Sequence, residues 1–175
     1  MPFLKSGVMP RTMLDTAIDT KSIATDYYKF GQIHNVVLYI DLKMTHVVGL
    51  VDNTVVVRIN FKKFNALPIK YTIDDVIQIS KVAILPEYEG QGIVSSIYSM
   101  LVSQGFTTVA DSTQFAPAKL LWKKLAKTSS SVYVVTTRGN ITKYTGSNIP
   151  DDTIWSSGLD QSGYGKMLIM TTAQL

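Results

Sequence analysis

Residues 85–105 read LPEYEGQGIVSSIYSMLVSQG and place two glycines, one residue apart, between an apolar run and a segment with helical periodicity. After the glycines, apolar residues recur in pairs three to four positions apart, which is typical of one buried helix face. Gly105 then stands where glycine commonly ends a helix. The pattern predicts a strand over residues 76–85, a glycine turn, and a helix over residues 91–102.

A strand that turns through glycines into a helix presents unpaired backbone N–H groups at the helix N-terminus. These donors and the helix dipole together favour a bound anion, and glycine lets a phosphate approach the backbone closely. The turn GQGIVSS has neither the lysine of a P-loop nor the spacing of the dinucleotide fingerprint. From the residues alone two interpretations stay open: a diphosphate held by amides, or glycines that only close a tight turn.

The remaining segments predict an α/β fold with a mixed sheet flanked by helices. Residues 46–61 are dense in Val and Ile and are interrupted by Asp52-Asn53, which predicts a hairpin. Further strands are expected at 35–42, 106–112, 131–138 and 166–172, helices at 12–18 and 116–127, a helical turn at 23–30, and a loop at 139–165.

Composition limits the class of protein. The chain has 175 residues, 46% hydrophobic and 17% charged, which favours one globular domain over residues 1–175. It has no cysteine, which excludes disulfides and thiol nucleophiles, and no apolar run of the roughly 18 residues that span a bilayer. We therefore expect a cytoplasmic protein, in the host cytoplasm if it is viral. The net charge of +4 mildly favours an acidic partner such as nucleic acid or CoA.

The segment ISKVAILPEYEGQGIV (residues 79–94) resembles the core motif of the GNAT superfamily of acyl-CoA-dependent N-acyltransferases. In that family a strand ends in a Pro-Glu-Tyr-like turn, followed by R/Q-x-x-G-x-G/A and a helix. Residues 106–126 are similar to the family's next strand and helix, so the resemblance covers about residues 34–138. It implies a GNAT-like mixed central sheet with splayed parallel strands, flanked by helices.

The resemblance also implies acetyl-CoA, or another acyl-CoA, as cofactor. Backbone groups of Val82, Ala83 and Ile84 would bind its pantetheine arm. The pyrophosphate would lie on the five amides of Gln91, Gly92, Ile93, Val94 and Ser95. Two positions depart from the family pattern, because Glu89 replaces Arg or Gln, and Val94 replaces Gly or Ala. A carboxylate beside a pyrophosphate costs about 1 kcal/mol unless it points into water.

The positions that are catalytic in the family depart further from the family pattern. Where many family members have a glutamate base this chain has Gln78, and where many have a tyrosine acid it has Trp122. An amide cannot accept a proton at neutral pH. We expect Asp111 to act as the base, with Ser112 and Tyr71 as further catalytic candidates. The alternative is that Asp111 caps the helix that follows it.

Three functions compete. The first is an acyltransferase acting on a primary amine of a protein or small molecule. The second is a phage-type, Mom-like DNA-modifying enzyme, since VADSTQFAPAKLLWKKL is similar to phage-encoded GNAT-like proteins. The third is a non-catalytic binding protein on the same fold.

Other clusters are less specific. His34 and His46 lack a partner pattern for a metal, so no metal site is expected. Lysines 119, 123, 124 and 127 predict a basic helix face, solvated or bound to a phosphate. The aromatic residues of the 139–165 loop, Tyr144, Trp155 and Tyr164, offer stacking surfaces or fold back on the sheet.

Overall fold

The computed structural model describes residues 3–5, 20–65, 67–69, 75–111, 113–129, 131–155 and 165–173. The chain divides into two compact units. Unit 1 comprises Met1–Val8, Lys63–Gln78 and Leu101–Leu175, and unit 2 comprises Met9–Lys62 and Ile79–Met100. The helix expected at 12–18 lies outside the described residues, as do Tyr71, Ser112 and Tyr164.

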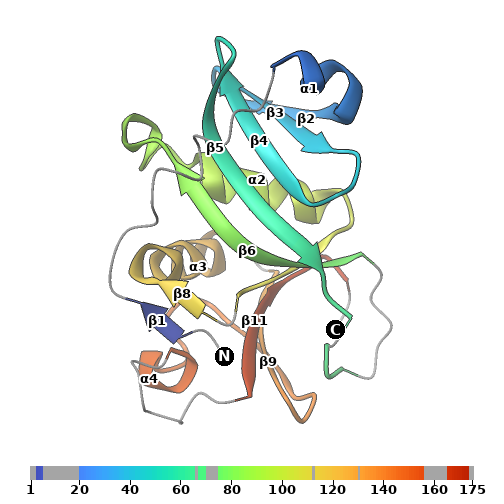
Figure 1. Cartoon of the computed structure of the whole chain (residues 1–175). Helices are drawn as coiled ribbons and strands as arrows, with labels where there is room; N and C mark the ends of the chain where they lie inside the picture. The colour runs from blue at the N-terminus through green and yellow to red at the C-terminus, as the bar shows by residue number, and fades with distance from the viewer. Residues whose placement is uncertain are drawn as a thin grey trace. The chain divides into compact units, whose positions relative to one another are not determined.

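Unit 2 is an antiparallel meander (Figure 1). Its elements, in chain order, are α1 (Thr20–Asp26), β2 (Tyr27–Ile33), β3 (Val36–Asp41), β4 (His46–Val51) and β5 (Thr54–Lys63). Next come β6 (Val76–Ile84), the 3-10 turn η2 (Pro86–Tyr88) and α2 (Ile93–Ser103). Both units share β6 and α2, because the division falls after Gln78 and after Met100.

The β4–β5 hairpin forms as predicted because its turn residues tolerate a left-handed backbone. Asp52 and Asn53 have φ values of 46° and 64°, the signature of a type I′ turn. One face of the meander is fully buried, with Val36, Leu38 and Val57 at 0% exposure. Removing such side chains from water supplies the main driving force for this layer.

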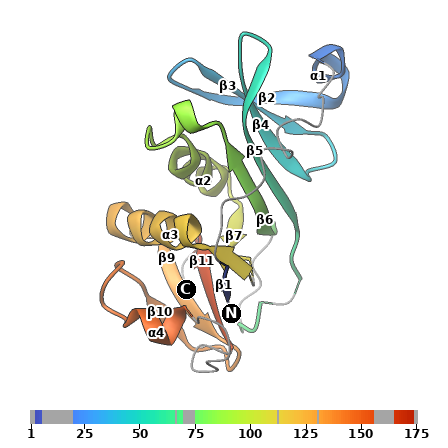
Figure 2. The same cartoon turned by 60° about the vertical axis from the view of Figure 1, so that its left-hand side comes forward.

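Unit 1 is built around β7 (Thr107–Val109), β9 (Val132–Thr136) and β11 (Lys166–Met170). Strand β11 pairs antiparallel with both β7 and β9, although it comes last in the chain (Figure 2). The remaining elements are β1 (Phe3–Lys5), β8 (Thr113–Phe115), α3 (Ala116–Thr128), β10 (Ile141–Lys143) and α4 (Asp151–Ile154). The core of this unit includes Val109, Val135 and Ile169.

The strand order is β10-β9-β11-β7-β6-β5-β4-β3-β2, with β1 and β8 in a separate pair. Strands β6 and β7 pair in parallel, whereas the pairings of β2 through β5 and of β7, β9, β10 and β11 are antiparallel. A mixed sheet with helices is therefore confirmed. Within the described part of the chain, no helix is long and apolar enough to cross a membrane.

Two expected elements, one near the start and one in the middle of the chain, form with different bounds. The helical turn expected at 23–30 ends at Asp26, because residues 27–33 pair with β3 as a strand. The strand expected at 106–112 stops at Val109, since Thr113–Phe115 forms a separate strand that pairs with Phe3–Lys5.

The first part of the expected loop, residues 139–155, is more ordered than a simple loop. It contains β10, which pairs with β9, and the short helix α4. Tyr144 is 0% exposed and Trp155 is 3% exposed. Both rings pack in the interior, so the interpretation of these two residues as stacking surfaces is wrong, and the alternative that they fold back is confirmed.

Candidate cofactor site

The turn after β6 is tightly folded and requires its glycines. Tyr88 N–H donates to the Leu85 carbonyl at 2.9 Å, and Glu89 N–H donates to the Pro86 carbonyl at 3.1 Å. Gly90 and Gly92 follow with φ values of 75° and 80°. Residues with a Cβ adopt this left-handed region only at a cost, so glycine is required at both positions for conformational reasons alone.

Five consecutive amides have no protein acceptor where this turn enters α2. The first bond of the helix runs from Ser96 N–H to the Gly92 carbonyl at 2.9 Å. Among the described residues, the N–H groups of residues 91–95 donate to nothing in the chain. First-turn amides have no partner within their own helix, so these donors need water or a ligand. They lie at the N-terminus of α2, which is the positive end of the helix dipole.

The side chains beside these amides leave them uncapped. Gln91 Nε2 donates to the Glu87 carbonyl at 2.7 Å, and Ser95 Oγ donates to the Gly92 carbonyl at 2.8 Å. Both side chains therefore tighten the turn through its carbonyls, and neither occupies an N–H group. Glu89 is exposed, as the water-facing alternative for its carboxylate requires.

The predicted pantetheine-binding residues lie at the end of β6. Its parallel pairing with β7 covers three positions and ends at Gln78 opposite Val109, the last residue of β7. Val82, Ala83 and Ile84 come after that point, and Leu85 N–H bonds to the Val56 carbonyl on β5 at 2.9 Å. Within the described residues, β7 offers no register partner to residues 82–84.

The predicted catalytic residues belong to unit 1. Asp111 is half-buried and lies two residues beyond β7, whereas Ser112 and Tyr71 are outside the described residues. Gln78 is buried, and its Nε2 donates to the Ala110 carbonyl at 3.3 Å. Trp122 is 1% exposed in α3. The assignment of Asp111, Ser112 and Tyr71 to catalysis stays a prediction.

The basic face expected on α3 is partly neutralised. Lys119 Nζ lies 2.8 Å from Asp151 Oδ2, and Lys123 Nζ lies 3.0 Å from Asp151 Oδ1. The Lys119 hydrogen bond outweighs burial and, with Lys123, lowers the pKa of Asp151. Lys124 and Lys127 are exposed. The separation of 28 residues between Lys123 and Asp151 left no signal of this pairing in the sequence.

A second polar cluster lies in unit 2, around His46, and nothing in the sequence pattern marked it. The His46 ring contacts the Tyr27 hydroxyl at 2.7 Å and the Thr45 hydroxyl at 2.9 Å. Its Nδ1 lies 3.5 Å from Asp41 Oδ1. No group of three or more His, Cys, Asp or Glu residues in the described part of the chain is arranged to hold a metal ion.

Comparisons with known proteins give structural likenesses only. No protein-family model matches the chain, and no curated protein matches it. One similar solved structure is the Bacillus subtilis N-acetyltransferase YlbP in complex with Coenzyme-A: TM-score 0.43, 13% identity, 73% of this chain and 67% of that chain covered. Another is the ribosomal-protein-S18-alanine N-acetyltransferase from Escherichia coli: TM-score 0.35, 13% identity, 88% and 78% covered. Both TM-scores are below 0.5, so neither likeness establishes an activity for this chain.

Proposed function

We propose that this chain binds acyl-CoA and acylates a primary amine of a protein or small molecule. The observation that carries the proposal is the row of five amides, residues 91–95, that have no acceptor among the described residues. A diphosphate accepts several hydrogen bonds and is stabilised by the positive end of a helix dipole. The glycines at 90 and 92 keep that approach open.

The end of β6 fits the pantetheine arm, the other recognisable part of the cofactor. Pantetheine carries amide groups along an extended chain, so it can pair with a strand edge as a peptide does. Residues 82–84 extend past the last register position shared with β7. Ala83 is buried, and Val82 and Ile84 are half-buried, so this edge lies in apolar surroundings where such hydrogen bonds are strongest.

Acyl-CoA supplies an activated thioester, whose acyl group passes to the amine nitrogen as the thiol leaves. The chain must take a proton from the ammonium form of the acceptor before that nitrogen becomes a nucleophile. We assign this role to Asp111, with Ser112 and Tyr71 as further candidates for handling protons. Gln78 and Trp122 lack a side chain that exchanges a proton at neutral pH.

Two observations keep other functions in view. The exposed Lys124 and Lys127, with the net charge of +4, favour a DNA substrate of the phage-type, Mom-like class. The engagement of buried Gln78 with Ala110 favours a non-catalytic binding protein. Retention on duplex DNA with a steep salt dependence would support the DNA-modifying enzyme, and CoA binding without any transfer would support the non-catalytic binding protein.

Incubation with acetyl-CoA, followed by intact-mass analysis of the acceptors, tests the proposal. The acceptors are a set of small primary amines, a lysine-rich peptide and duplex DNA. We expect one acetyl group on an amine and none on DNA. Acetylation or other modification of DNA alone supports the DNA-modifying function, and the absence of any product despite measurable CoA binding contradicts catalysis.

A further inference from the structure

The outer face of α3 carries one leucine and two lysines, Leu120, Lys124 and Lys127, which we call the α3 stripe. Residues spaced by four and three positions lie on one side of a helix, so the three side chains follow one another along α3. All three are exposed, and the exposed fraction of Leu120 is 68%. Trp122 and Leu125, on the opposite side of the helix, are buried. The α3 stripe is therefore the side of the helix that faces solvent.

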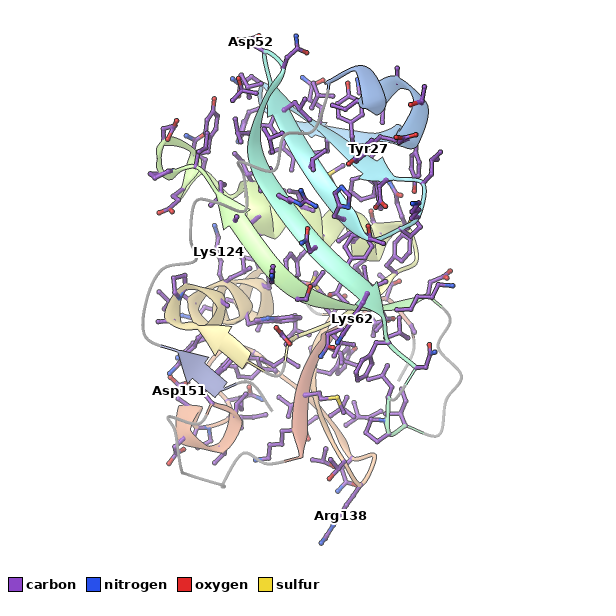
Figure 3. All side chains as sticks on the ribbon, viewed as in Figure 1. Tyr27, Asp52, Lys62, Lys124, Arg138 and Asp151 are labelled. Carbon is purple, nitrogen blue, oxygen red and sulfur yellow. The ribbon has the colours of Figure 1, made fainter. Side chains whose placement is uncertain are left out.

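The two lysines of the α3 stripe keep their positive charge uncompensated. Lys119 and Lys123, on the neighbouring side of the helix, share the carboxylate of Asp151. Among the residues that the structure describes, neither Lys124 nor Lys127 forms an ion pair. In Figure 3, Lys124 lies above α3 and Asp151 lies below it. The charge of the stripe is therefore available to an acidic partner.

Packing against a glycine holds the stem of Lys127 in place. A Cβ added at Gly146 would lie 2.9 Å from Lys127 Cγ and 3.4 Å from Lys127 Cε. The lysine stem therefore lies against the backbone of residue 146, in space that only glycine leaves open. A side chain that is already held loses less conformational freedom when a partner binds.

The positive charge of the chain is concentrated in the unit that contains α3. Unit 1 has ten Lys and Arg residues and six Asp and Glu residues, whereas unit 2 has seven of each kind. The whole net charge of +4 thus belongs to unit 1. A positive surface attracts acidic partners and speeds their association.

Leu120 distinguishes between two kinds of acidic partner. Lysines alone suit the phosphates of a nucleic acid as well as the carboxylates of a polypeptide. Single-stranded nucleic acids gain from exposed aromatic rings on which bases stack, but Tyr144 and Trp155, the aromatic residues of the adjoining segment, are buried. An acidic polypeptide can instead place an apolar side chain on Leu120 and on the lysine stems, while its carboxylates reach the ammonium groups.

We propose that the α3 stripe binds an acidic polypeptide segment that carries an apolar side chain among its carboxylates. The leucine supplies the preference for that apolar side chain, and the two lysines supply the preference for negative charge. The proposal rests on the exposure, charge and packing of the stripe. It is independent of acyl transfer, because binding can be measured without acyl-CoA.

The test compares two short peptides of equal length and charge, both rich in Asp and Glu, by calorimetric titration of the full chain. One peptide has a central leucine and the other has serine at that position. We expect the leucine peptide to bind about tenfold more tightly, the effect of burying one such side chain. Leu120→Ser should remove this preference. Leu42→Ser is the matched control in unit 2, at a position that is 60% exposed, and should leave the preference intact.

The lysines are tested by removing one charge at a time. Lys124→Gln and Lys127→Gln should each weaken the binding of both peptides about two- to fivefold, the effect of one exposed charge pair. Each change should also reduce the dependence of affinity on salt concentration. Lys62→Gln, at an exposed position on β5, is the matched control and should change neither quantity. All these positions are exposed, so the variants should fold like the wild type.

NMR of the wild-type protein gives a readout that does not depend on variants. The leucine peptide should shift the amide signals of Leu120, Lys124 and Lys127 and leave those of Leu42 and Lys62 unchanged. Equal affinities for the two peptides, tighter binding of a single-stranded DNA of equal charge, or no binding at millimolar concentration would overturn the proposal. Shifts confined to residues outside α3 would overturn it as well.

Discussion

The side-chain amide of Gln78 donates a hydrogen bond to the backbone carbonyl of Ala110 across a distance of 3.3 Å. It joins β6 to the first residue after β7, next to the last register pair of the two strands, Gln78 opposite Val109. The bond uses the N–H of the amide, which a carboxylate lacks. Gln78 therefore has a structural role in the position where the family that residues 79–94 resemble places a base.

Replacing Gln78 with Glu should destabilise the protein by about 3 kcal/mol at pH 8, because a buried carboxylate would face a carbonyl without a donor between them. Burial raises the folded pKa of such a group above its unfolded value of about 4.3. The loss of stability therefore grows as pH rises from the unfolded pKa of the new carboxyl group to its raised folded pKa, and it is small below pH 4. Urea unfolding across pH 4–8 measures it. Gln32→Glu, at an exposed position on β2, should change stability by less than about 0.5 kcal/mol.

Asp111→Asn should lower any measured acyl-transfer rate by about a hundredfold, the usual contribution of a general base, while leaving CoA affinity unchanged. The measurement is single-turnover transfer at saturating acetyl-CoA. Asp75→Asn is the control, because Asp75 is exposed and its left-handed backbone suits asparagine equally well. A rate for Asp111→Asn within a few-fold of wild type would refute the assignment.

Asp41→Asn should cost about 1–3 kcal/mol at pH 7, because the Asp41 carboxylate accepts hydrogen bonds from Thr45 N–H, His46 N–H and the Thr45 hydroxyl. These bonds hold the folded pKa of Asp41 below its ordinary value, against the effect of burial. Its stabilisation is therefore complete above the unfolded pKa and is lost as pH falls through the folded one. Unfolding free energies of mutant and wild type, measured by urea unfolding, should converge as pH falls through the lowered folded pKa of Asp41. The control Asp26→Asn, at an exposed position, should change stability at pH 7 by less than about 0.5 kcal/mol.

Gly49→Ala should destabilise the meander by about 1–3 kcal/mol. A Cβ there would lie 2.5 Å from Val57 Cγ1 and 2.6 Å from Val36 Cγ1, and both neighbours are stiff, fully buried side chains. Gly31→Ala would meet the flexible end of Met100, which can move. In thermal unfolding, the Tm of Gly49→Ala should be well below the Tm of Gly31→Ala. The reverse order would contradict the packing of this layer.

Local rules were enough to predict the strand–turn–helix around residues 85–105 and the hairpin at Asp52-Asn53. Each depends on a backbone conformation that few residue types adopt, so each leaves a mark in the sequence. The strand at 27–33 left none, because YYKFGQI carries no clear period and its pairing with β3 includes a bulge between Lys29 and Gly31. Three-residue strands such as β1 and β8 depend on tertiary pairing alone.

The candidate site likewise has features that the sequence could predict and features that it could not. Unpaired amides at the start of α2 follow from backbone geometry, so glycine spacing could predict them. Other contacts join residues that are distant in sequence. Asp151 pairs with Lys119 and Lys123. A chain of contacts runs from Tyr27 through His46 and Thr45 to Asp41. Side-chain pairing at such separations has no local pattern, and only the fold brings these groups together.

The affinity of CoA, measured by titration calorimetry against that of pantetheine, tests most directly whether residues 91–95 hold a diphosphate. We predict that CoA binds at least about tenfold more tightly than pantetheine. Gly92→Ala should abolish this difference, because a Cβ at a φ of 80° strains the turn that presents the amides. Gly105→Ala, at a φ of 95° with open space around its Cβ, imposes similar strain at the other end of α2 and should leave the difference intact. Equal affinities for CoA and pantetheine in the wild-type protein would contradict the proposed site.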